Sequence, residues 1–148
     1  MGCGPSEPRG ATNGNFTVTT EKTCFKIKVE KPNSNDVNEY TYEAFYLEMP
    51  LSALMNFLNF DQNQGAKMDA NFISRFDAQI ARFRYFIQRL SGTEIENEKN
   101  PYEGNMWVPY INGKQIDWDF ACEKDMPVKP SDEIIWRYEK LTAGGSPN

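Results

Sequence analysis

Residues 106–118 read MWVPYINGKQIDW, and this stretch decides the fold that the sequence predicts. Met106–Ile111 is apolar and aromatic, which is typical of a strand, and Asn112-Gly113 readily adopts the positive-φ conformations of a tight hairpin turn. Lys114–Trp118 is then the returning strand. Pro109 has no N–H to donate, so we expect the first strand to have a free edge or a bulge there.

Three further runs predict strands of the same sheet. Residues 16–30 include a segment in which Phe25, Ile27 and Val29 alternate with more polar residues, as in a half-buried strand. The turn-forming residues 31–36 separate it from the aromatic run 40–48, so the two runs form a hairpin. The last run is 133–138, EIIWRY. Its core-facing side is expected to carry alternate residues, namely Ile134, Trp136 and Tyr138.

The helical pattern is clearest just after the hairpin. Pro50 suits a helix N-terminus, and the spacing of the leucines and methionine that follow predicts an amphipathic helix over 51–60, with an apolar face of Leu51, Leu54, Met55 and Leu58.

Residues 66–91 leave two structures open. Their apolar residues are spaced three and four apart, which favours a helix; they are Ile73, Phe76, Ile80, Phe83, Ile87 and Leu90. However, the run 84–90, RYFIQRL, also suits a buried strand that ends at Ser91-Gly92.

The order of these pieces resembles the transcobalamin C-terminal-like domain family, a small β-grasp-type module. The resemblance rests on PLSALMNFL, YFIQRLSGTEI, MWVPYINGKQI and VKPSDEIIWRYE. It implies an α+β fold in which one main helix packs on one face of a mixed sheet. It also favours a strand at Tyr85–Leu90 and confines any helix to Asn71–Ala81. The sequence departs from the family pattern at Ser131, where the family has glycine, and in a longer, more charged segment at 66–84.

Composition limits the domain organisation and the chemistry. The chain has 148 residues, no histidine, three cysteines and a net charge of −5. The length predicts a single domain over 16–141, which the resemblance implies is β-grasp-like, and the polar, Gly- and Pro-rich residues 1–15 and 142–148 predict flexible arms on either side of it. Without histidine there is no Ser–His–Asp triad and no histidine metal site, and an acidic chain has no general electrostatic attraction to nucleic acid. We therefore expect no enzyme activity, catalytic residue, metal site, cofactor or nucleic-acid partner.

The hairpin supplies the candidate residues for binding a ligand or a partner, which are Trp107, Tyr110, Asn112 and Trp118. Aromatic side chains give large contact areas at low entropic cost, although packing in the core is the competing interpretation for them. The function predicted is a non-enzymatic binding or scaffolding module. The resemblance implies an alternative, a small-ligand carrier or cap of corrinoid type in a secreted protein, because the family covers one face of cobalamin.

The first residues, MGCGPS, match an acylation pattern, with Gly2 as the myristoylation site and Cys3 as a palmitoylation site. Two acyl chains would anchor the domain stably to a membrane surface, so this pattern predicts a cytoplasmic protein at the inner leaflet. A secreted protein would instead use the sequon at Asn15 and could pair Cys24 with Cys122. In a cytoplasmic protein Cys24 and Cys122 are instead expected to be free, buried thiols.

Overall fold

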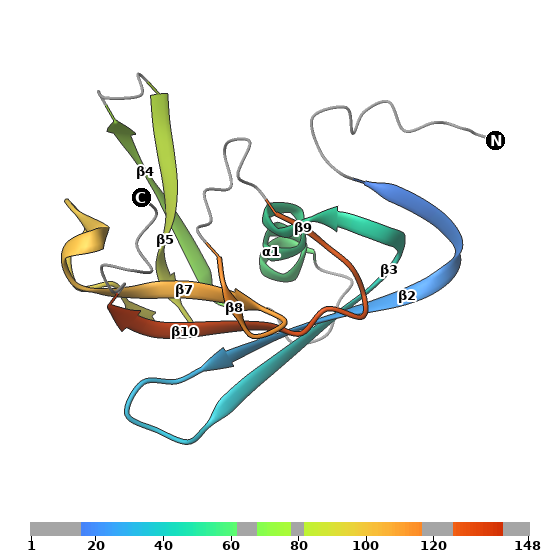
Figure 1. Ribbon diagram of the computed structural model, residues 1–148, viewed down its shortest axis with the longest axis horizontal. Coiled ribbons are helices and arrows are strands. Elements are labelled where there is room, and N and C mark those ends of the chain that lie inside the picture. The colour runs from blue at the N-terminus through green and yellow to red at the C-terminus, as the bar shows by residue number, and fades with distance from the viewer. Residues whose placement is uncertain (1–15, 62–67, 78–81, 117–125, 141–148) are drawn as a thin grey trace.

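A computed structural model describes residues 16–61, 68–77, 82–116 and 126–140 of the chain, with 73–77 and 82–85 described by their backbone. The fold is α+β and is made mostly of strands (Figure 1). Within the described residues α1 is the only α-helix, joined by one short 3-10 helix, η2 (Pro101–Glu103). In the same ranges no helix is long and apolar enough to span a membrane.

The main sheet has six strands in the order β8-β7-β10-β2-β3-β9. β10 is parallel to β2, and all other neighbouring strands are antiparallel, so the predicted mixed sheet is confirmed. The strands are β2 (Thr17–Glu30), β3 (Val37–Pro50), β7 (Asn105–Ile111), β8 (Lys114–Gln115), β9 (Pro127–Val128) and β10 (Ile134–Lys140).

The long hairpin of β2 and β3 confirms the first predicted strand pair, and its two strands are bent where the register shifts between Val18 and Thr23. The turn of the second predicted hairpin is also confirmed, because Asn112 and Gly113 have φ values of 54° and 84°. Pro109 marks the end of pairing with β8, as expected for a residue without an N–H. Its carbonyl accepts a hydrogen bond from the Ile116 N–H at 2.9 Å.

Helix α1 (Leu51–Phe60) follows β3 directly and confirms the predicted helix. Its four predicted apolar residues are all buried, and they pack into the core over one face of the main sheet. Phe57 stacks on Tyr42 of β3 with 5.0 Å between the ring centroids. We call the face that α1 covers the inner face.

A second, three-stranded sheet has the order β4-β5-β6, made of β4 (Ala70–Asp77), β5 (Arg82–Leu90) and β6 (Thr93–Glu94). The strand favoured for Tyr85–Leu90 is confirmed. The helix expected within Asn71–Ala81 is wrong as far as Asp77, and 78–81 lie outside the described residues. The backbone of β4 pairs with β5 instead, in a register that places Phe72 opposite Ile87, Ile73 opposite Phe86 and Phe76 opposite Phe83. The backbone pairing of β4 with β5 therefore replaces the helix that the apolar spacing predicted.

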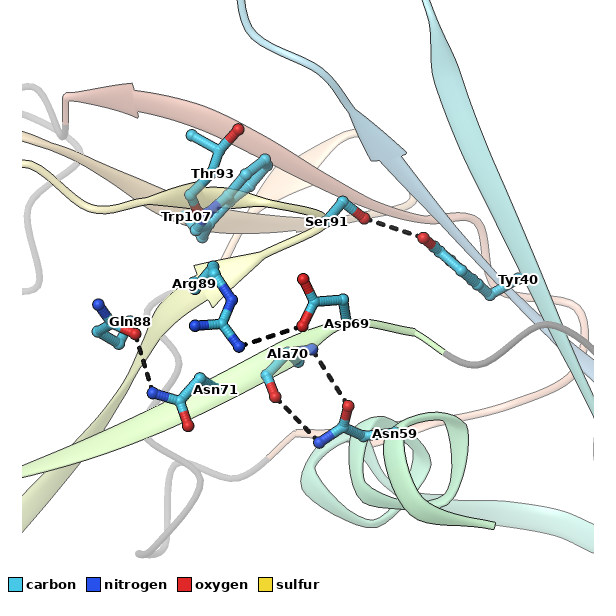
Figure 2. A network of polar contacts seen from close by, with 10 residues as sticks. All are labelled: Tyr40, Asn59, Asp69, Ala70, Asn71, Gln88, Arg89, Ser91, Thr93 and Trp107. Atoms are coloured by element: carbon cyan, nitrogen blue, oxygen red, sulfur yellow. Dashed lines mark hydrogen bonds and ion pairs between the residues drawn. The ribbon is translucent and has the colours of Figure 1, made fainter. Parts of the chain in front are cut away.

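Three contacts hold this small sheet on the inner face of the main one. The Trp107 Nε1–H donates to the Thr93 carbonyl at 2.9 Å, and the Tyr138 hydroxyl donates to the Glu94 carbonyl at 2.7 Å. The hydroxyls of Tyr40 and Ser91 lie 2.9 Å apart (Figure 2). Side chains of both sheets and α1 form one core, which includes Phe25, Ile27, Leu54, Phe86, Leu90, Val108, Ile134 and Trp136.

Helix α1 is joined to β4 by a polar side chain. The Asn59 amide donates to the Ala70 carbonyl at 3.0 Å and accepts from the Ala70 N–H at 3.1 Å, so it pairs with β4 as a neighbouring strand would (Figure 2). Next to it, the Asn71 amide donates to Gln88 at 2.9 Å across the β4–β5 ladder. The small sheet is therefore held by hydrogen bonds as well as by the shared core.

Candidate binding surface

The predicted binding residues do not come together in one site. Trp107 lies on the inner face and is only 3% exposed. Its ring packs against Tyr138 with 5.2 Å between centroids, and its N–H is used by Thr93. Trp107 is therefore a core residue that joins the two sheets.

Tyr110 lies on the opposite, outer face of β7, because residues three apart on a strand point to opposite sides. The Arg137 guanidinium lies over its ring at 4.5 Å, and the Arg137 Nε–H donates to Glu30 at 3.1 Å. The Tyr110 hydroxyl donates to the Glu139 carboxylate. Desolvation, and then this hydrogen bond, raise the pKa of Tyr110. Tyr110 is thus the centre of a half-buried polar cluster that crosses three strands.

Asn112 fixes the loop that precedes β10. Its amide donates to the Asp132 carboxylate at 3.0 Å and accepts from the Glu133 N–H at 2.9 Å. The other oxygen of Asp132 accepts from the Lys129 N–H at 2.8 Å, and the Asp132 N–H donates to the Lys129 carbonyl at 3.0 Å. These bonds close residues 129–132 into a turn, which we call the 129–132 loop. No positive φ is needed at Ser131, so serine is tolerated where the resembled family has glycine.

The remaining predicted site residues lie outside the described residues. They are Gly2, Cys3 and Trp118, and the same holds for Cys122. Acylation at Gly2 and Cys3 and a disulfide between Cys24 and Cys122 stay predictions. Cys24 itself is half-buried on β2.

The structure adds a candidate binding surface that the sequence did not reveal. A hollow of about 280 Å³ lies on the outer face between Lys26 and Lys28 of β2, Glu39 of β3 and residues 130–134. Two lysines and three acidic residues, Glu39, Asp132 and Glu133, therefore line the same hollow. Such a hollow can accept a partner that carries an acidic group next to a basic one.

A second hollow, of about 380 Å³, lies at the other side of the same loop. Thr17, Leu47, Glu48 and residues 129–131 line it. Leu47 is 49% exposed, and Phe45, two residues before it on the same face of β3, is 54% exposed. Two large apolar side chains this exposed and this close together are unusual on a protein surface. The 129–132 loop therefore separates a charged hollow from an apolar one.

Part of this surface could have been recognised from the sequence. The alternation in 24–30 already puts Lys26 and Lys28 on the side away from Phe25 and Ile27. What the pattern lacks is the position of the 129–132 loop, which lies about a hundred residues further along the chain and forms one wall of each hollow.

Within the described ranges, no group of three or more His, Cys, Asp or Glu side chains is arranged to hold a metal ion. The chain matches no protein-family model, no curated protein and no solved structure.

Proposed function

We propose that this chain is a non-enzymatic protein-binding module built on a β-grasp-type sheet. The strand topology supports this fold type: a β2–β3 hairpin is followed by α1, and the late strand β10 lies parallel to β2 in the middle of the sheet. β4 then belongs to the segment 66–84, where the sequence is longer than the resembled family requires, whereas β5 contains the strand that the resemblance favours.

The observation that carries the binding function is the pair of hollows on the outer face. Helix α1 and the small sheet both occupy the inner face, and the outer face of the β2–β3 hairpin keeps Lys26, Thr41, Glu43, Phe45 and Leu47 exposed. Charged and apolar groups side by side are typical of surfaces that recognise proteins. The partner places charged groups against Lys26 and Lys28 and an apolar side chain against Leu47.

A corrinoid-type carrier is less well supported by the same surface. Pockets for small molecules have volumes of roughly 300–1,000 Å³ and enclose most of their ligand. The two hollows measure about 280 and 380 Å³ and lie on an open face, which suits single side chains of a partner better than a whole cofactor.

Selection from a library of random peptides displayed on phage, with the immobilised protein as target, tests the proposal. The selected peptides are synthesised, and their affinities are measured by fluorescence anisotropy. We expect the double substitution Lys26→Glu and Lys28→Glu to weaken binding by about tenfold or more, because it reverses both positive charges of the hollow. Lys114→Glu is the matched control, since Lys114 is an exposed lysine at the start of β8 that lines neither hollow.

Three results would contradict the proposal. The first is that no peptide is selected above a blank surface, and the second is that the double variant binds the selected peptides as well as Lys114→Glu does. The third is a saturable change of tryptophan fluorescence on titration with cyanocobalamin, which would favour the carrier.

A further inference from the structure

The backbone of β3 has an edge that no described strand covers. β9 pairs with β3 only at Met49 and Pro50, and between Val37 and Glu48 the only described neighbour of β3 is β2 on its other side. An uncovered edge of this length is uncommon, because exposed N–H and C=O groups invite pairing with another strand.

The direction of the backbone groups along this edge follows from contacts on both sides. The carbonyls of Ala44 and Tyr46 face β2, where the Thr23 hydroxyl donates to them at 3.0 and 2.7 Å. Met49 faces the other way, toward Val128 of β9, and the Leu51 N–H donates to the Met126 carbonyl at 2.7 Å on that same side. Since successive residues alternate, the odd-numbered residues of β3 turn their N–H and C=O groups to the open side. We call this row the β3 edge, formed by Glu39, Thr41, Glu43, Phe45 and Leu47.

We propose that the β3 edge binds an extended segment of another protein as an added antiparallel strand. This inference deepens the proposed function, on which it rests, by stating the form that the partner takes. β9 already shows such pairing at one end of the edge, and the apolar hollow beside Leu47 adjoins the place where β9 leaves it. Main-chain hydrogen bonds supply affinity in this mode, and side-chain pairs supply specificity.

The charges on the outer face define the partner further. In β2 and β3, Lys28 lies opposite Glu39, and Lys26 lies opposite the short Thr41. Glu43 forms an ion pair with Lys22 at 3.6 Å. An added strand continues this alternation when it carries basic residues facing Glu39 and Glu43 and an acidic residue that reaches across Thr41 to Lys26. Apolar residues then face Phe45 and Leu47.

A second copy of this chain fits the β3 edge poorly. β3 carries three glutamates and no lysine or arginine, so two copies paired through this edge would bring six glutamates onto one pair of strands. Like charges on neighbouring strands destabilise a sheet. The charge pattern therefore favours a different protein as the partner.

The probe for this inference is the fluorescein-labelled peptide VTITKTETK. Its first and third residues face Leu47 and Phe45, its two lysines face Glu43 and Glu39, and its glutamate faces Thr41. N-methylation of the first lysine removes an N–H that would donate to β3, whereas N-methylation of the threonine after it alters a group that points to solvent. We expect the first change to weaken binding by about tenfold or more and the second to leave it unchanged.

Substitutions in the protein test the same hydrogen bonds from the other side. Thr41→Pro removes an N–H that faces the open edge and that β2 does not use, so the sheet tolerates it. We expect it to abolish peptide binding, while Thr41→Val, which keeps the N–H, binds normally. Hydrogen exchange of the Phe25 and Ile27 amides shows that the sheet of each variant is intact. The double substitution Glu39→Lys and Glu43→Lys should instead prefer the peptide VTITETETE, in which glutamates replace the two lysines and the glutamate that faces Thr41 and Lys26 is kept.

The outcomes separate this inference from the proposed function. Equal effects of the two N-methylations, or normal binding by Thr41→Pro, would overturn the added strand. If Lys26→Glu with Lys28→Glu still weakened the peptides selected from the library, the binding module would stand. If, in addition, Lys26→Glu with Lys28→Glu did not weaken the selected peptides, both the added strand and the binding module would be wrong. A dimer in sedimentation that Thr41→Pro abolishes would replace the foreign partner by a second copy and so contradict the inference.

Discussion

Tyr42 shows how a single side chain connects the hairpin to the end of α1. It is 8% exposed, its ring stacks on Phe57, and its hydroxyl donates to the Asp61 carboxylate at 2.9 Å. Burial, and then the hydrogen bond and charge of Asp61, raise the pKa of Tyr42 to about 12. The neutral phenol is thus the form that the folded protein stabilises.

This shift predicts how stability depends on alkaline pH. A pKa that folding raises contributes stability that is complete below the unfolded value of 10.0 and is lost as pH rises through about 12. The contribution is roughly 2–3 kcal/mol for a shift of this size. We expect Tyr42→Phe to be less stable than wild type at pH 8, by about 1 kcal/mol for the lost hydrogen bond, and the difference to vanish and then reverse as the pH rises from 10 to 12.

Urea unfolding followed by circular dichroism at several pH values measures this difference. The prediction is wrong if the two proteins lose stability in parallel above pH 10.

At the scale of the element, Asn59 determines how β4 meets α1. Asn59→Ala leaves the N–H and the carbonyl of Ala70 without the side-chain partner that each has now. Partly buried backbone groups that lose their partners cost about 1–3 kcal/mol, so we expect the free energy of unfolding to fall by that amount. Urea unfolding gives the value.

Asn56→Ala is the control on the same helix, because the described contacts include no hydrogen bond from the Asn56 side chain. Equal losses in the two variants would show that the contact of Asn59 with β4 does not explain the effect, because helix propensity alone favours alanine over asparagine.

The small sheet also shows where prediction from the sequence succeeded and failed. The hairpins, the helix and the closing strand follow from short-range patterns, namely alternation, the Asn112-Gly113 turn and the apolar spacing after Pro50. The spacing of the apolar residues between Ile73 and Leu90 predicted a helix wrongly, because intervals of three and four residues also occur in two paired strands. In the first strand the apolar residues Phe72, Ile73 and Phe76 are one and then three positions apart. In the second strand Phe83, Phe86 and Ile87 have the same spacing in reverse order, and the register pairs the two sets residue by residue. A mirrored apolar pattern is the sequence signal that indicates this hairpin.

The binding surface was harder to predict than the elements. The sequence predicted binding residues around the Asn112-Gly113 turn. In the structure, however, Trp107 is buried and the Asn112 amide donates to Asp132 of the 129–132 loop. The two hollows depend on contacts between β2–β3 and that loop, which local patterns do not specify. Tertiary contacts between distant segments therefore determine the site, whereas local patterns determine most of the elements.

For the molecule as a whole, both sheets share one core. Leu54 of α1 is fully buried within it, together with residues of the main sheet and of β5. Leu54→Ala removes buried side-chain volume, and such changes cost 2–5 kcal/mol in typical cores. We expect this loss to appear equally in both sheets, because neither sheet has a core of its own.

Amide hydrogen exchange under native conditions tests this expectation, with Phe25 reporting on the main sheet and Leu90 on the small one. If the opening free energy fell at Leu90 alone, the small sheet would be a separate unit of stability.

The central place of β10 has a consequence for how the chain reaches this structure during synthesis. β10 lies between β7 and β2, and it is the last described strand to leave the ribosome. Until it arrives, the N-terminal hairpin and the β7–β8 hairpin have no strand between them, and Phe25, Ile27 and Val29 lack Ile134 and Trp136 as neighbours. The sheet is therefore completed only once β10 has left the ribosome, and contacts between residues about a hundred positions apart set the rate of that step.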